Sequence, residues 1–175
     1  MPLSHKFRLV ILLLVLGCTV GCDQTSKHFA RIRLGESGFV TLPGGFGELR
    51  LAENPGSFLS LGASLPESLR LTLLTFGVGA GLCGILIYLV ASRRLRWFSF
   101  AGPALVWAGG TSNLIDRIAR HGRVSDFIFI QVGPFHTGIF NVADVVIMLG
   151  FAALAWELWK QQHNPAAGKS KPERS

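Results

Sequence analysis

The sequence predicts an all-α membrane protein with four transmembrane helices and a small extracytoplasmic β element. Of its 175 residues, 49% are apolar and only 15% are charged, against about a quarter charged in soluble domains. The mean hydropathy is +0.43, and the apolar residues gather in four long runs. We therefore expect a single polytopic membrane domain over residues 1–160, followed by a disordered cytoplasmic tail, 161–175.

The four runs are predicted to be the transmembrane helices. The first covers residues 9–22 without a charge and is expected to continue past Asp23. The second covers 71–92, the third 97–115 and the fourth about 138–159. A helix of about 20 apolar residues crosses a bilayer.

An even number of spans places both termini on one side of the membrane, and basic residues indicate that this side is cytoplasmic. The short connection between the second and third runs and the two tails carry the densest basic residues: Arg93, Arg94, Arg96, Lys6, Arg8, Lys160, Lys169, Lys171 and Arg174. The formal charge of +7 is thus expected to face lipid headgroups. We expect no nucleic-acid partner.

Two outer connections are too long to be simple turns. The first, about residues 30–68, is rich in glycine and contains strand-like pieces at 39–42 and 49–51 around Pro43-Gly44-Gly45. The second, 117–137, is strand-like or amphipathic. We expect a small sheet on the outer membrane surface.

The first apolar run also resembles a signal peptide, because a basic start precedes it. The stretches that end at Cys18 and Cys22 both resemble a lipobox, the cleavage site of bacterial lipoproteins. A lipid-anchored protein or membrane scaffold without enzymatic activity is therefore an alternative. The three following spans argue against it, and the cysteines are expected to pack as small apolar residues.

Acidic residues within or beside membrane spans are energetically costly and therefore candidates for function. Four qualify: Asp23, Asp116, Asp126 and Asp144. Each could instead be a helix-end group in the headgroup layer. Asp116 could also be the ion-pair partner of a neighbouring arginine.

The neighbours of these acids favour a site at the outer ends of the third and fourth spans. Asn113 and Arg117 are four residues apart, and Asn141 and Asp144 are three apart, so each pair shares a helix face. Asp126 lies where the chain returns to the membrane. Two converging carboxylates share one proton, so one can accept a proton from water while the other polarises a carbonyl group. Because such a pair titrates as a unit, either aspartate could be the acid.

Five ordered blocks resemble the motifs of lipoprotein signal peptidases (signal peptidase II). Residues 23–27, Asp-Gln-Thr-Ser-Lys, resemble the family's DQxTK motif, and 54–58, Asn-Pro-Gly-Ser-Phe, its NxGxxF segment. Residues 109–117 are similar to GxxxNxxDR, 122–127 to GxVxDF and 140–144 to FNxAD. Ser26 stands where threonine is common and Ser112 where glycine is frequent, and neither departure touches the acidic pair.

The resemblance implies an aspartyl endopeptidase that uses no cofactor and no metal. Its catalytic residues would be Asp126 and Asp144, with the substrate and the pair positioned by Asn54, Asn113, Arg117 and Asn141. Structural support would come from Asp23, Lys27, Gly109, Asp116 and Ala143.

The implied partners are membrane lipids and prolipoproteins that already carry diacylglycerol on the lipobox cysteine, and cleavage would fall just before that cysteine. The resemblance further implies a monomer in the bacterial cytoplasmic (inner) membrane, with its active site at the extracytoplasmic face.

Other enzyme classes and transporters fit the sequence less well. Ser26 and Lys27 are adjacent and do not face each other on a helix, and Ser57 has no histidine within any apolar run to act as its base. His121 and His136 are isolated, unlike the histidines of a metalloprotease motif. A transporter could use membrane aspartates, but four spans without an internal repeat make a poor carrier.

Overall fold

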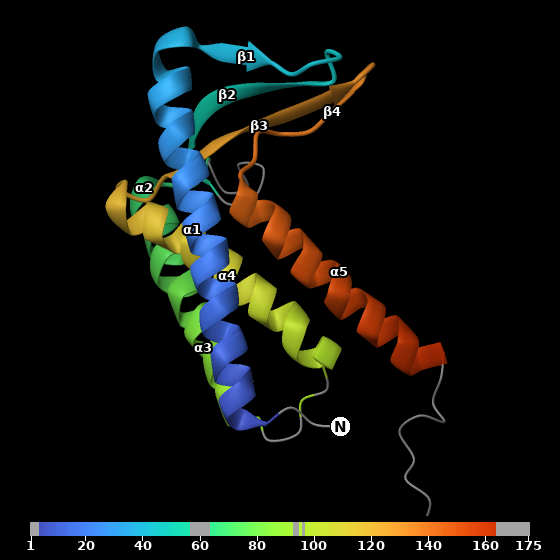
Figure 1. Cartoon of the computed structure of the whole chain (residues 1–175). Coiled ribbons are helices and arrows are strands. Elements are labelled where there is room, and N and C mark those ends of the chain that lie inside the picture. Colours follow the sequence, from blue (N-terminus) through green and yellow to red (C-terminus); the bar gives the residue numbers. More distant parts are fainter. Residues whose placement is uncertain (1–3, 57–63, 93–94, 96, 164–175) are drawn as a thin grey trace, which may run out of the picture.

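The protein is a bundle of helices with a small antiparallel sheet at one end (Figure 1). This computed structural model describes residues 4–56, 64–92, 95 and 97–163. Its elements, in chain order, are α1 (His5–Ser37), β1 (Phe39–Thr41), β2 (Gly47–Asn54), α2 (Glu67–Leu71), the π-helix η2 (Thr72–Gly77), α3 (Val78–Ala91), α4 (Trp97–Ala119), β3 (Val124–Val132), β4 (Phe135–His136) and α5 (Val142–His163).

The first helix is longer than the sequence predicted. It continues to Ser37, so residues 30–37, expected in the outer loop, are helical. Ala30 and Leu34 lie one turn apart and pack against Phe127 beneath the sheet, and this apolar contact favours continuing the helix. The helix ends at Gly38, whose φ is 78° and whose N–H donates to the carbonyl of Leu34, as glycine commonly does at helix ends.

Three of the described helical segments are long and apolar enough to cross a membrane: His5–Gly35, Glu67–Ala91 and Val142–His163. The middle one joins α2, η2 and α3, and it starts four residues before the predicted run. The third predicted span, α4, is not among these three. Its small and polar residues lower its hydropathy, and the same residues let it pack closely in the bundle.

The contact between α4 and α5 is closest where glycines lie. A Cβ atom added to Gly109 would lie 2.7 Å from the carbonyl oxygen of Ala143, and one added to Gly102 would lie 2.9 Å from that of Gly150. Both distances are below ordinary van der Waals contact. The absent side chains therefore permit the approach that brings the N-terminal end of α5 to α4.

At the other end of the bundle, Arg8 joins α1 to the end of α3. Its side chain is only 4% exposed and donates hydrogen bonds to the carbonyls of Leu89 and Ser92. These are carbonyls left without partners at a helix C-terminus. Arg93, Arg94, Arg96 and residues 164–175, on which the predicted topology also depends, lie outside the described residues.

The sheet has the strand order β1-β2-β3-β4, and all neighbours are antiparallel. The strand-like pieces predicted at 39–42 and 49–51 correspond to β1 and β2. The second strand is longer than predicted because it pairs with β3 along most of its length, from Gly47↔Ile130 to Asn54↔Val124. The strand-like pattern predicted within 117–137 is confirmed by β3, although α4 first continues to Ala119.

Candidate active site

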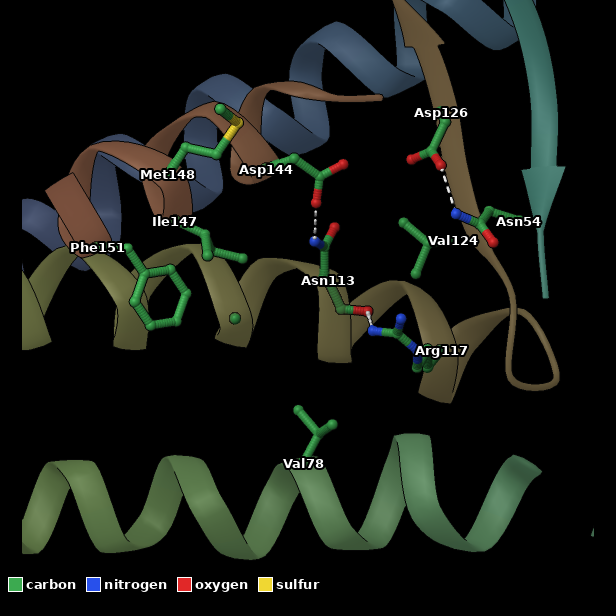
Figure 2. A pocket seen from close by; sticks show the side chains of 11 residues that line it. Asn54, Val78, Asn113, Arg117, Val124, Asp126, Asp144, Ile147, Met148 and Phe151 are labelled. Atoms are coloured by element: carbon green, nitrogen blue, oxygen red, sulfur yellow. Dashed lines mark hydrogen bonds between the residues drawn. The ribbon is translucent and has the colours of Figure 1, made fainter. Parts of the chain in front are cut away.

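Asp126 and Asp144 lie on different elements and line the same cavity, of about 310 Å³. Asp126 is on β3 and is 2% exposed; Asp144 is in the first turn of α5 and is 8% exposed. Figure 2 shows both carboxyl groups pointing into the space between these two elements. The structure thus brings together the two aspartates that the sequence singled out.

Two side-chain amides hold Asp126. The Nδ2 group of Asn54 donates to one carboxyl oxygen at 2.8 Å, and the Nδ2 group of Asn141 donates to the other at 2.7 Å. Burial raises the pKa of Asp126 from 3.8 to about 6, against the opposing effect of Asn54, and the charge of Asp144 adds to the rise. Asp126 therefore exchanges its proton near neutral pH, as acid–base catalysis requires.

Asp144 is held by a reciprocal cap at the start of α5. The Oδ1 atom of Asn141 accepts from the backbone N–H of Asp144 at 3.0 Å, and a carboxyl oxygen of Asp144 accepts from the backbone N–H of Asn141 at 3.2 Å. This is the capping-box arrangement, with asparagine and aspartate three residues apart. Its consequence is that one residue, Asn141, contacts both aspartates.

Lys27 is fully buried behind the pair. Its Nζ atom lies 2.7 Å from Asp23, 3.0 Å from Asp116 and 3.0 Å from the Oδ1 atom of Asn113. Asn113 in turn donates to Asp144 at 2.9 Å. A chain of contacts therefore runs from the buried lysine to the carboxyl group in the cavity. Asp116 also pairs with a neighbouring arginine, as the sequence suggested, because the Nε atom of Arg120 lies 3.9 Å from its other carboxyl oxygen.

Asp23 connects the first helix to the last. One of its carboxyl oxygens accepts from the backbone N–H of Ala143 at 2.9 Å, and the other accepts from the hydroxyl of Ser112 at 2.7 Å. Backbone N–H groups in the first turn of a helix have no partner within the helix. Asp23 is the partner of one such N–H group, that of Ala143, which lies 120 residues later in the sequence.

Three residues that sequence reasoning did not assign to the site also belong to this network. Gln24 donates to Asp116 at 3.2 Å and to the hydroxyl of Ser112 at 3.3 Å. The backbone N–H of Ser125 donates to Asp116 at 3.2 Å. Gln24, Ser112 and Ser125 all lie within the motif blocks, so the signal was present, but only the three-dimensional contacts reveal their roles.

Arg117 connects the cavity to the chain that follows β2. It donates to the carbonyl of Gly56 at 3.0 Å, and the N–H of Gly56 donates to the side-chain oxygen of Asn54 at 2.9 Å. Three of the four predicted positioning residues line the cavity: Arg117, Asn54 and Asn113. The fourth, Asn141, bonds to both aspartates. The structure thus brings all four to the pair. Ser57 and Phe58, the end of the same motif block, lie outside the described residues.

A β-bulge determines which residues of β3 accompany Asp126. The N–H groups of Phe127 and Ile128 both donate to the carbonyl of Phe140, at 3.0 and 2.9 Å, so two residues oppose one. Phe127 and Ile128 both pack towards α1. Asp126 and Phe129, three positions apart, consequently line one common cavity on the opposite face, which strict alternation of side chains does not allow.

The cavity is polar at the aspartates and apolar elsewhere. Val78, Ile147, Met148 and Phe151 form its wall between α3 and α5, as Figure 2 shows. Phe39 and Phe46, in the part of the chain that forms β1 and the turn before β2, are about half exposed and do not line it. Within the described parts of the chain, no group of three or more His, Cys, Asp and Glu side chains is arranged to hold a metal ion.

Comparisons with known proteins agree with this arrangement. The family model for signal peptidase (SPase) II, Peptidase A8, matches residues 14–160. The lipoprotein signal peptidase of Syntrophus aciditrophicus (strain SB) is 31% identical over 160 residues, covering 90% of this chain and 97% of the relative. That of Azoarcus sp. (strain BH72) is 32% identical over 163 residues, covering 91% and 89%.

A solved structure described as a bacterial membrane enzyme shares the fold, with a TM-score of 0.75, 21% identity and coverage of 94% of both chains. Family model and relatives each span most of the sequence. The chain therefore belongs to the signal peptidase II family of aspartic membrane proteases.

Proposed function

We propose that this protein removes the signal peptide from diacylglyceryl-modified prolipoproteins by cleaving just before the lipidated cysteine, with Asp126 and Asp144 as the catalytic pair. The observation that carries the proposal is the cavity in which two buried carboxyl groups, joined through Asn141, meet an apolar wall. A protease that acts on lipid-linked substrates needs both the carboxyl pair for hydrolysis and the apolar wall for the lipid-linked, apolar part of the substrate. The names of the relatives support the substrate class.

In the proposed reaction, the pair carries one proton. The ionised carboxylate takes a proton from water as the water oxygen attacks the scissile carbonyl carbon, and the protonated carboxyl donates to the carbonyl oxygen. The resulting tetrahedral intermediate collapses when the C–N bond breaks and the amine of the cysteine receives a proton. General acid–base catalysis of this kind contributes typically 10²–10⁴-fold, and no covalent intermediate with the enzyme is formed.

The amides are proposed to orient the pair and the arginine to orient the substrate. Asn54 and Asn141 hold Asp126, and Asn113 holds Asp144, so each carboxyl keeps one orientation. Arg117, at the cavity wall, holds the Gly56 carbonyl that follows β2. Structural support is proposed for the buried set behind them: Asp23, Lys27, Gly109, Asp116 and Ala143.

The proposed topology has four membrane crossings, with α4 as the third, and both termini in the cytoplasm. The sheet and the aspartate pair then lie at the extracytoplasmic face of the bacterial inner membrane. Residues 1–160 form one domain, and the protein acts as a monomer surrounded by lipid. The exposed apolar side chains of the helices, such as Leu13 (69%) and Phe76 (74%), support contact with lipid.

The experiment is a processing assay with purified protein and a lipidated reporter prolipoprotein. Asp126→Asn and Asp144→Asn are each expected to abolish cleavage while the protein still inserts into membranes. Glu67→Gln, at an exposed acid in the first turn of α2, is the matched control and should cleave normally. Normal processing by either aspartate variant would contradict the catalytic assignment.

A further inference from the structure

Asp126 and Asn54 line a second cavity as well as the first. This second cavity, of about 290 Å³, lies on the sheet side and is bounded by β2, β3 and the connection before α5. Its volume is close to the lower end of the range of ligand pockets, roughly 300–1,000 Å³. The catalytic carboxyl thus stands between an apolar cavity among the helices and a polar cavity against the sheet.

Arg50 is the cation of this second cavity. Its guanidinium carbon lies 4.0 Å from the centre of the Phe129 ring, a cation–π distance. Its Nε atom is buried and has no hydrogen-bond partner among the described residues. Both acidic groups of the same cavity are already engaged. A carboxyl oxygen of Glu53 accepts from the Ser125 hydroxyl at 3.2 Å and lies 3.9 Å from Arg120, and Asp126 accepts from two asparagine side chains. Arg50 is therefore the charged group of this cavity that keeps an unsatisfied donor.

The strand register relates Arg50 to the catalytic pair. Ala52 lies opposite Asp126 in the β2–β3 register, and Arg50 precedes it by two residues on β2, within the stretch from Leu49 to Ala52 where the register shifts. Arg50 and Asp126 line the same cavity, so a substrate peptide bound at Asp126 can place a neighbouring side chain at Arg50.

We propose that the second cavity receives the first residues of the mature lipoprotein, those that follow the lipidated cysteine, and that Arg50 selects acidic side chains there. This inference rests on the proposed function. A prolipoprotein is apolar before the scissile bond and polar after it, and the two cavities that meet at Asp126 have the same order of polarity. Arg50 is a specificity-determining residue in this scheme and takes no part in the bond cleavage.

The test uses three lipidated reporters with one signal peptide that differ only in the two residues after the cysteine: acidic, neutral or basic. They compete for the purified enzyme in a zwitterionic detergent, so that anionic lipid does not contribute. The wild type is expected to prefer the acidic over the basic reporter in kcat/KM by roughly tenfold, about the effect of one charge-assisted hydrogen bond at a partly exposed site.

Variants of Arg50 separate selection from stability. Arg50→Gln keeps donors without the charge and should bring the ratio close to one, and Arg50→Glu should reverse it. Arg123→Gln, at an exposed arginine just before β3, should leave the ratio unchanged. If Arg50→Glu does not accumulate in the membrane, the Arg50→Gln ratio decides.

Three results overturn the inference: equal cleavage of all reporters by the wild type, an unchanged ratio in Arg50→Gln with unchanged rates, or an unchanged ratio in that variant with an equal loss of rate for all reporters. The first two mean that the cavity holds solvent only, and the third that Arg50 is structural. The proposed function fails differently, when the wild type cleaves none of the reporters or Asp126→Asn cleaves them.

Discussion

Asn141 donates a 2.7 Å hydrogen bond from its side chain to Asp126, and the same side chain caps the helix that carries Asp144. The orientation of Asp126 and the start of α5, which carries Asp144, thus both depend on Asn141. The two roles use different atoms, Nδ2 and Oδ1. Substitutions can therefore separate them.

Replacing Asn141 by serine should keep the helix cap and lose the bond to Asp126. Serine is a good N-cap residue, so the loss of thermal stability in detergent should come from the missing bond to Asp126 and not from the end of α5. Loss of a hydrogen bond to a charged group, about 1.5–3 kcal/mol, should lower kcat/KM by roughly 10- to 100-fold. Asn141→Ala should show the same kinetic loss and a further destabilisation of about 1 kcal/mol. Equal stabilities of the two variants would argue against the capping role.

The raised pKa of Asp126 predicts a stability that falls as the pH rises. In the unfolded chain this carboxyl loses its proton near pH 3.8, whereas in the folded protein it keeps the proton to about pH 6. The folded state therefore binds more protons between these values, and its stability decreases through this window. The contribution of this group is about 3 kcal/mol.

Asp126→Asn should remove that part of the pH dependence. The difference in unfolding midpoint between the wild type and this variant, measured in detergent from pH 3.5 to pH 7, should shift in favour of the variant as the pH rises. The exposed Glu67→Gln variant should follow the wild type throughout. A pH-independent difference between the wild type and Asp126→Asn would show that burial does not raise the pKa of this carboxyl group.

Lys27→Met should destabilise the protein strongly. The substitution leaves the carboxyl groups of Asp23 and Asp116 buried without the cation that lies 2.7 and 3.0 Å from them. Breaking a buried ion pair on one side costs about 3–5 kcal/mol. Adding Asp23→Asn to Lys27→Met should restore part of the loss, because one uncompensated charge is then gone. Thermal unfolding of the two variants measures this, and an unaltered midpoint for Lys27→Met would refute it.

Gly109→Ala should lower activity by moving α5 away from α4. The new Cβ would lie 2.7 Å from the carbonyl oxygen of Ala143 and 2.8 Å from a side-chain carbon of Ile147, so the first turn of α5 and Asp144 must shift. Misplacement of about 1 Å can cost roughly 100-fold in rate. Gly21→Ala is the matched control, since a Cβ there meets nothing within 4 Å and alanine favours a helix. Equal kcat/KM values in both variants would show that α4 and α5 tolerate separation.

Four candidate aspartates could be located from the sequence because acidic residues stand out in an apolar chain, and the five motif blocks narrowed them to the pair. Asn113 with Arg117 and Asn141 with Asp144 share helix faces at fixed spacing, and the structure places these faces around one cavity. The helices could be predicted to within four residues of their ends where hydropathy decides them, as for the segment Glu67–Ala91 and for α5. The boundary of α1 could not, because Arg31 and Arg33 suggest a loop while Ala30 and Leu34 bury against the sheet.

Other features depend on contacts that no local pattern encodes. The bulge at Phe127 and Ile128 arises from pairing with Phe140, and it decides which neighbour shares a cavity with Asp126. Ser112, noted in the sequence only as a departure from glycine, bonds to Asp23 from another helix. In each case, the partner lies too far along the chain for spacing to reveal it.

The spacing of Asp23 and Lys27 has a consequence for biosynthesis. Both belong to α1, whereas their later partners, Asp116 and the N–H of Ala143, are synthesised about 90 and 120 residues afterwards. Because the two are four residues apart and already paired at 2.7 Å, the helix can enter the bilayer with these charges mutually neutralised. The pair thus shields the nascent helix until the last span arrives and Asp23 takes up its bond to α5.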